Sequence, residues 1–301
     1  CHGVEGLCGS GVQVFALHDV EWREKARAQG VAVLYVHALN PHGFSFLRRV
    51  THENVDLNRN FIDFDRPLPA NPGYVELHPL LLPEHWPPSL QNETALGQIV
   101  SECGEAELQA IISRGQYELP DGLFYGGNAP VWSHTTWRTI LQTYGRKATR
   151  MAWLDVHTGL GPFGFGERMY AGRNQEADMQ RAIRWWGGNG TTPVTVPGDG
   201  HSASAELTGQ MHGAIAEECP QAELTGLTLE FGTIPAIQVL QALRGDHWLH
   251  LHPEADPVLI EQIQAQMRHA FYDDSEGWKG QIISQSRQAM FQAVDGLAEA
   301  G

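Results

Sequence analysis

The stretch Met151-Ala152-Trp153-Leu154-Asp155-Val156-His157 decides the fold class of this chain. Its first six residues are mostly apolar and show no regular polar alternation, which is typical of a strand covered on both faces. Two further runs, 31–36 and 227–231, have the same character. Each of the three runs is followed by a polar residue or a glycine-containing turn.

Helical patterning fills much of the sequence between these runs. We expect helices within 10–30, from Asn92 onward, and over 134–149, 176–187, 235–244, 257–272 and 280–298. Strands that alternate with helices predict an α/β fold. The expected architecture has three layers: a mixed, mostly parallel, twisted sheet with helices on both faces, in one domain over 1–301. The proline-rich stretch 66–88 is interpreted as a surface excursion.

Composition and charge exclude several classes of protein. The chain has 301 residues, of which 42% are hydrophobic and 18% charged, as in ordinary globular domains. Its 20 basic and 35 acidic residues give a net charge of −15. Such a surface repels phosphate backbones and anionic lipids, so we expect no nucleic-acid partner and no membrane partner. Four scattered cysteines favour a reducing compartment, and the predicted location is cytoplasmic.

The sequence opens at Cys1-His2 without an initiator methionine. The simplest interpretation is that residues upstream have been removed or left out. An N-terminal cysteine can also act as a nucleophile with its own amine as the base. We regard a Cys1 nucleophile as a minor alternative, because the position more simply reflects where the chain was cut.

The first candidate for chemistry is His2-Gly3-Val4-Glu5-Gly6. A turn between His2 and Glu5, which the glycines permit, would let both side chains reach one ion. A histidine nitrogen and a carboxylate oxygen suit zinc, and a catalytic zinc site needs a third protein ligand. His157 is a natural third ligand because it follows a buried strand. A chance pairing of His2 with Glu5 is the competing interpretation.

A second candidate is Asn54-Val55-Asp56-Leu57-Asn58-Arg59-Asn60-Phe61, which follows Arg48-Arg49 and the turn Asn40-Pro41-His42-Gly43. The guanidinium group offers a fork of donors that matches a carboxylate, and asparagine adds an amide donor. This pattern predicts a site for a carboxylate, and a solvated loop is the alternative.

Glu230 is the third candidate, because a carboxylate near the end of an apolar strand is costly to bury unless it is paired or functional. It could take a proton from a metal-bound water and pass it to a leaving amine. A buried salt bridge with an arginine is the structural alternative.

Together these motifs resemble the zinc carboxypeptidase (funnelin) superfamily. The order that matches is His-x-x-Glu, Asn-Pro-x-Gly, an arginine, Asp-x-Asn-Arg-Asn-aromatic, a histidine at a strand end and a late strand glutamate. The residues of these motifs, including Asp155-Val156-His157-Thr158-Gly159, look more like those of an uncharacterised bacterial branch of this superfamily than those of the digestive enzymes. One departure is that no tyrosine occurs between Ala171 and Phe231, where digestive carboxypeptidases carry a mobile one. A second is that the strand expected to lead into His2 is missing, so the resemblance implies a domain that is N-terminally truncated and lacks its N-terminal strands.

The resemblance implies a role for each matching residue. It implies that His2, Glu5 and His157 are the ligands of one Zn²⁺ ion and that Asp56 orients the first histidine. Arg49 matches the arginine that polarises the scissile carbonyl, with Arg48 as the competing choice. Asn58 and Arg59 match the pair of residues that binds a free C-terminal carboxylate. Glu230 matches the general base.

The function that follows is a metallopeptidase, a zinc-dependent hydrolase of peptide or amide bonds. Its substrate would be a small peptide or an N-acyl amino acid with a free carboxylate. Two alternatives remain open. One is an N-acyl amino acid deacylase similar to aspartoacylase or succinylglutamate desuccinylase, and the other is a non-catalytic ligand-binding protein that retains the groove.

Overall fold

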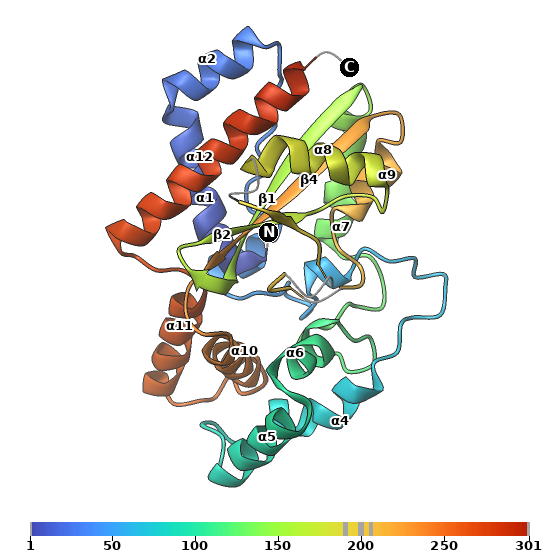
Figure 1. Ribbon diagram of the computed structural model, residues 1–301. Helices are drawn as coiled ribbons and strands as arrows, with labels where there is room; N and C mark the ends of the chain where they lie inside the picture. The colour runs from blue at the N-terminus through green and yellow to red at the C-terminus, as the bar shows by residue number, and fades with distance from the viewer. Residues whose placement is uncertain (1, 189–191, 198–201, 205–206, 300–301) are drawn as a thin grey trace.

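The fold is built on a four-stranded mixed sheet in the order β1-β4-β2-β3 (Figure 1). The computed structural model describes residues 2–188, 192–197, 202–204 and 207–299. The strands are β1 (Arg150–Phe163), β2 (Gly166–Tyr170), β3 (Val194–Thr195) and β4 (Glu223–Gly232). β1 runs parallel to β4, β2 antiparallel to β4, and β3 parallel to β2. The structure therefore confirms an α/β fold with a mixed sheet.

Two of the three predicted strands are confirmed and the third is wrong. The run before His157 forms the first half of β1, and the run before Gly232 forms the second half of β4. The run 31–36, in contrast, has no regular secondary structure. A strand needs a neighbouring backbone for its hydrogen bonds, and a groove of about 860 Å³, lined by residues of both segments, lies beside 31–36 and β1. Val33 and Leu34 are accordingly 42% and 53% exposed.

One face of the sheet is covered by three helices, α1 (Gly6–His18), α8 (Glu176–Trp186) and α12 (Glu276–Ala298), and α2 (Val20–Ala28) packs on α1 and α12. The predicted helical stretch 10–30 thus contains two helices. They are separated at Asp19, whose side chain caps α2 by accepting a hydrogen bond from the Trp22 backbone N–H at 3.2 Å. Leu227, Leu229 and Phe231 of β4 are fully buried in this layer.

The opposite face is only partly covered by helices. Here α7 (Trp132–Ile140), the π-helical turn η3 (Leu141–Gly145) and α9 (Gly213–Glu218) pack on Met151, Trp153 and Leu224. Only the first part of the predicted helix 134–149 is therefore α-helical. The rest of this face, toward the ends of β1 and β4, lies open to a cavity.

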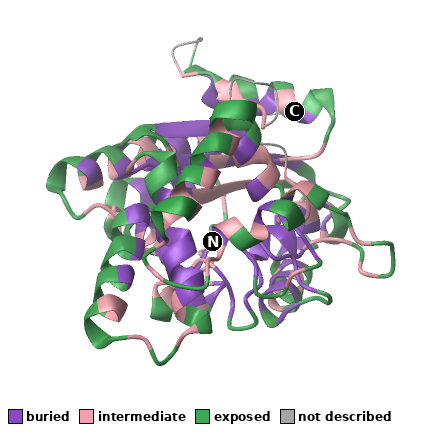
Figure 2. Cartoon of the chain, turned by 90° about the horizontal axis from the view of Figure 1, so that it is seen from below, coloured by how far each residue is buried: buried purple, intermediate pink, exposed green. Residues whose placement is uncertain are grey.

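A helical half of the molecule lies beyond that end of the sheet, in the lower part of Figure 1. Its helices are α4 (Pro72–Leu81), α5 (Leu90–Cys103), α6 (Glu105–Ser113), α10 (Ala236–Leu251) and α11 (Pro257–Phe271). The short helix α3 (Pro41–Phe46) packs against the 3₁₀ turn η1 (Gly3–Glu5). The interpretation of 66–88 as a surface excursion is wrong in part, because α4 buries Tyr74, Leu77 and Leu81 in the core of this half. Figure 2 shows exposed residues on the outward sides of the helices and in the connecting loops. Within the described residues, no helix combines the length and apolar character needed to cross a membrane.

Gly226 is the position where the sheet tolerates a side chain least. A Cβ atom there would lie 1.9 Å from the Ala171 carbonyl oxygen and 2.1 Å from the Trp153 ring. We predict that Gly226→Ala lowers the free energy of unfolding by about 1–3 kcal/mol, as overpacking usually does. Gly11→Ala is the control, because a Cβ at Gly11 of α1 meets nothing within 4 Å. In urea denaturation the control should gain about 0.5–1 kcal/mol from helix propensity. Equal midpoints for the two variants would contradict this account of the sheet.

Candidate metal centre

The structure brings His2, Glu5 and His157 together. One ligand atom from each residue lies within 4.8 Å of the other two, and all three residues are buried. His2 precedes the 3₁₀ turn η1 (Gly3–Glu5), and Glu5 is the last residue of that turn. His157 lies on β1, where it pairs with Glu230 of β4. The regular β1–β4 ladder breaks after Thr158. Side chains separated by about 150 residues thus form one group that could hold a metal ion.

Close backbone packing fixes the turn that carries His2 and Glu5. Gly3 has a positive φ of +44°, and a Cβ atom there would lie 1.9 Å from the Arg48 carbonyl oxygen. The next residue, Val4, donates its N–H to that same oxygen at 2.9 Å. The Cα atom of Gly43 lies 2.8 Å from the same hypothetical Cβ. The glycines of the two sequence motifs therefore allow the two turns to lie against each other.

Each histidine of the group has a carboxylate beside it. His2 Nδ1 lies 3.4 Å from Oδ1 of Asp56, the residue that the resemblance implies as its orienting carboxylate. His157 Nε2 lies 3.0 Å from Asp155 Oδ2, while its Nδ1 lies 3.0 Å from Glu5 Oε2. Sequence reasoning missed Asp155. The signal was present, because residues two apart on a strand point to the same face.

Arg49, and not Arg48, contacts the group. The Arg49 guanidinium donates to Glu5 Oε1 at 2.6 Å and to Asp56 Oδ2 at 3.0 Å, and its Nη2 lies 3.0 Å from His2 Nε2. Arg48 instead donates to Asp246 at 3.0 Å. The sequence left Arg48 and Arg49 as competing candidates for one position. The side-chain contacts show that Arg49 is the one next to the group.

The predicted carboxylate site lies in the same region. Asp56 begins the 3₁₀ turn η2 (Leu57–Arg59) and accepts the Asn58 backbone N–H at 2.9 Å. Arg59 is 1% exposed, and its guanidinium donates to the carbonyls of Ser113 and Asn58. The Asn58 side-chain oxygen accepts the Met211 backbone N–H at 2.9 Å. Both side chains are therefore held in place by backbone groups rather than being solvated.

Glu230 is buried next to the group. Its Oε1 atom accepts a hydrogen bond from the Leu160 backbone N–H at 3.2 Å. Burial, together with the negative charge of Glu5, raises the pKa of Glu230 to about 8. A carboxyl group with a pKa near neutrality is suited to exchange protons in a reaction.

The two histidines have opposite electrostatic surroundings. Burial and then the charge of Arg49 hold the pKa of His2 well below its usual range, so His2 is neutral. Burial also opposes the charged form of His157, but Asp155 and Glu5 outweigh it and raise the pKa of His157 to about 10. In the absence of a metal, an imidazolium at His157 and the guanidinium of Arg49 supply the positive charge of the site.

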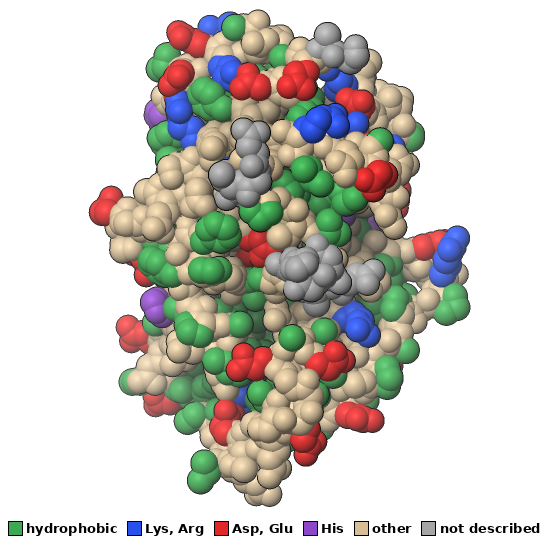
Figure 3. All heavy atoms as spheres, viewed as in Figure 1, with side chains coloured by type: hydrophobic (Ala, Val, Ile, Leu, Met, Phe, Trp, Pro, Cys, Tyr) green, Lys and Arg blue, Asp and Glu red, His purple; other side chains and the backbone are tan. Residues whose placement is uncertain are grey.

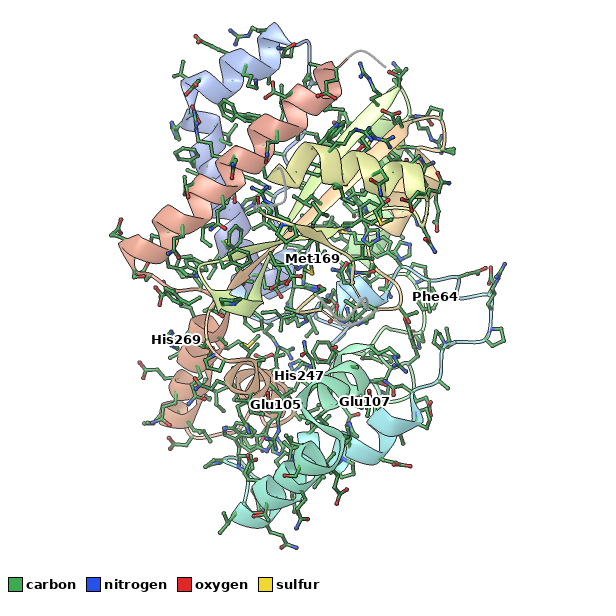
Figure 4. The ribbon with its side chains drawn as sticks, viewed as in Figure 1. Phe64, Glu105, Glu107, Met169, His247 and His269 are labelled. Atoms are coloured by element: carbon green, nitrogen blue, oxygen red, sulfur yellow. The ribbon has the colours of Figure 1, made fainter. Side chains whose placement is uncertain are left out.

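A cavity of about 470 Å³ opens onto these residues (Figure 3). The predicted site residues that line it are His2, Glu5, Arg49, Asn58, Arg59, His157 and Glu230. Figure 4 shows Met169 on the sheet side of this cavity and Glu105 on the helical side, and both residues line it. His212, which lines the cavity as well, carried no signal in the sequence. Cys1 lies outside the described residues.

Comparison with known families gives one match, over residues 1–285, to a family described as "Protein of unknown function (DUF2817)". The chain belongs to the DUF2817 family. That description carries no activity, so membership of DUF2817 defines the relatives of the chain and not its chemistry. No curated protein and no solved structure matched the chain in the corresponding searches.

The raised pKa of Glu230 predicts a pH dependence of stability in the metal-free protein. Between pH 4.5, the usual pKa, and about 8, the folded state keeps a proton on Glu230 that the unfolded state releases. The folded state binds more protons there, so stability contributed by this group is present below pH 4.5 and is lost as the pH rises through 8. With chelator present, wild type should lose stability relative to Glu230→Gln across this window in urea titrations. Parallel curves for the two proteins would show that the site does not raise this pKa.

Proposed function

We propose that this protein is a zinc-dependent hydrolase of peptide or amide bonds, similar to the zinc carboxypeptidases. The observation that carries the proposal is the buried group of His2, Glu5 and His157, with ligand atoms within 4.8 Å of one another, beside the buried Glu230. Two imidazoles and one carboxylate are a common ligand set for catalytic zinc, and they leave a position for water or substrate.

The residues present fit a zinc ion. His2 Nδ1 faces Asp56 Oδ1 at 3.4 Å, which leaves Nε2, on the side of Arg49, as the His2 nitrogen for the metal. A neutral imidazole is the form that binds metal, and the lowered pKa of His2 favours it. Asp56 and Asp155 are placed to orient the two imidazoles, as carboxylates commonly do around metal-bound histidines. Metal binding would release the proton of His157 and so compete with the imidazolium.

Bound zinc would polarise a carbonyl group and lower the pKa of water. The protein's own residues would transfer the proton and stabilise the developing negative charge. Glu230, buried beside the group, would accept the proton of the attacking water and deliver it to the leaving amine. Arg49, whose guanidinium lies against Glu5 and His2, would donate to the carbonyl oxygen as negative charge develops there.

Asn58 and Arg59 would bind a free carboxylate of the substrate. Both line the cavity, and their side chains are held by hydrogen bonds to the backbone. A fixed guanidinium loses little freedom when it forms a further hydrogen bond to a carboxylate. The proposed substrate is therefore an amide with a nearby carboxylate, such as a peptide C-terminus or an N-acyl amino acid.

The decisive variant is Glu230→Gln. We predict that it lowers kcat by about 10²–10⁴-fold, the usual contribution of a general base, while zinc content stays unchanged. Glu24→Gln, at an exposed position of α2, is the control and should keep full activity. Chelation should abolish wild-type activity and added zinc should restore it.

The assay should use two substrate types on one preparation, a peptide with a free C-terminus and an N-acyl amino acid. Activity on one type alone would separate a carboxypeptidase from a deacylase. Activity that survives both chelation and Glu230→Gln would contradict the proposal, and ligand binding without any turnover would favour a binding protein.

A further inference from the structure

The cavity continues from the metal centre into the helical half, where its wall is apolar. This part of the wall is made by three helices, α5, α6 and α10. Its apolar side chains include Leu96, Val100, Leu108, Ile112, Leu240 and Leu243. We call this set the apolar chamber. Leu96, Leu108, Ile112 and Leu243 belong to the core cluster of the helical half, so packing fixes the wall.

We propose that the apolar chamber binds a large aliphatic or aromatic group of the substrate, next to the amide that is cleaved. This inference rests on the proposed function, because it names the substrate class of the same cavity. A volume of about 470 Å³ is in the range of cavities that hold small-molecule ligands. The substrate class is an amide that carries a free carboxylate and one bulky hydrocarbon group.

The distribution of charged side chains along the cavity wall sets the orientation of the proposed substrate. Among the described residues that line the cavity, the Arg side chains are Arg49 and Arg59, and both lie within 4 Å of Asp56. On the helical side, Glu93 is already bonded to Arg244 and Gln241, each at 2.9 Å. The chamber thus offers no cation to a negatively charged group. The carboxylate and the amide would lie at the metal centre, and the hydrocarbon group in the chamber.

Gly97 of α5 provides a way to fill the chamber. It lines the cavity, and a Cβ atom at this position meets nothing within 4 Å. A larger side chain at Gly97 can therefore project from the helix without a clash against the protein. Because Gly97 is an exposed residue that lines the cavity, we expect a phenylalanine there to obstruct the cavity at its open side and so to compete with a long substrate group. Gly11 of α1 is a matched helical glycine with equally open surroundings, and it is not among the cavity residues.

The test compares kcat/KM for N-acyl amino acids with acetyl, hexanoyl and decanoyl chains, and for peptides with alanine or phenylalanine at the scissile bond. Each methylene that enters the chamber should raise kcat/KM by about fourfold, the equivalent of 0.8 kcal/mol. Gly97→Phe should lower the ratio of decanoyl to acetyl activity by at least tenfold, and Gly11→Phe should not change it. A size preference in the acyl series or in the peptide series identifies which substrate supplies the hydrocarbon group.

A binding measurement separates this inference from the proposed function. Calorimetry with acetate, hexanoate and 4-phenylbutanoate needs no turnover, and affinity should rise with the size of the apolar group. Gly97→Phe, or Leu240→Ser if that variant does not fold, should remove this rise. If hydrolysis is absent but this binding pattern is found, the proposed function fails and the chamber remains. The inference about the apolar chamber is wrong if affinities and rates do not depend on the size of the apolar group of the ligand, or if Gly97→Phe leaves them unchanged.

Discussion

Buried negative charge is the constraint on which the rest of the site depends. The carboxylates of Glu5, Asp56 and Glu230 are at most 6% exposed. Burying even one charge without a partner costs several kcal/mol, so the surrounding residues have to provide positive charge or protons. Arg49 bonds to two of these carboxylates, and the third keeps a proton up to a pKa of about 8. The group of His2, Glu5 and His157 could hold a metal ion, which would add further positive charge.

The topology explains how residues so distant in sequence reach this point. β1 and β4 run parallel, so His157 and Glu230 lie side by side in the ladder. The turn that carries His2 and Glu5 lies against the backbone of Arg48 and so reaches the same end of the sheet. The helical half then encloses that end and supplies the apolar wall of the cavity. One end of the sheet thus combines a polar centre with an apolar chamber.

Much of this arrangement could be predicted from the sequence, and the failures have physical causes. Apolar runs identified β1 and β4, but the same rule failed for 31–36, because strand formation also needs a neighbouring backbone that periodicity does not reveal. The candidate ligands were found through local motifs. The choice between Arg48 and Arg49 depends on side-chain direction, which spacing alone does not set. The apolar chamber combines residues from three helices far apart in the chain, so no local pattern could indicate it.

Anomalous scattering at the zinc absorption edge, on crystals grown with zinc, tests the central claim most directly. We predict one strong peak among the side chains of His2, Glu5 and His157, at a distance of about 2.0–2.2 Å from a nitrogen or oxygen of each. A peak elsewhere on the protein, or no peak in this group at saturating zinc, would contradict the account.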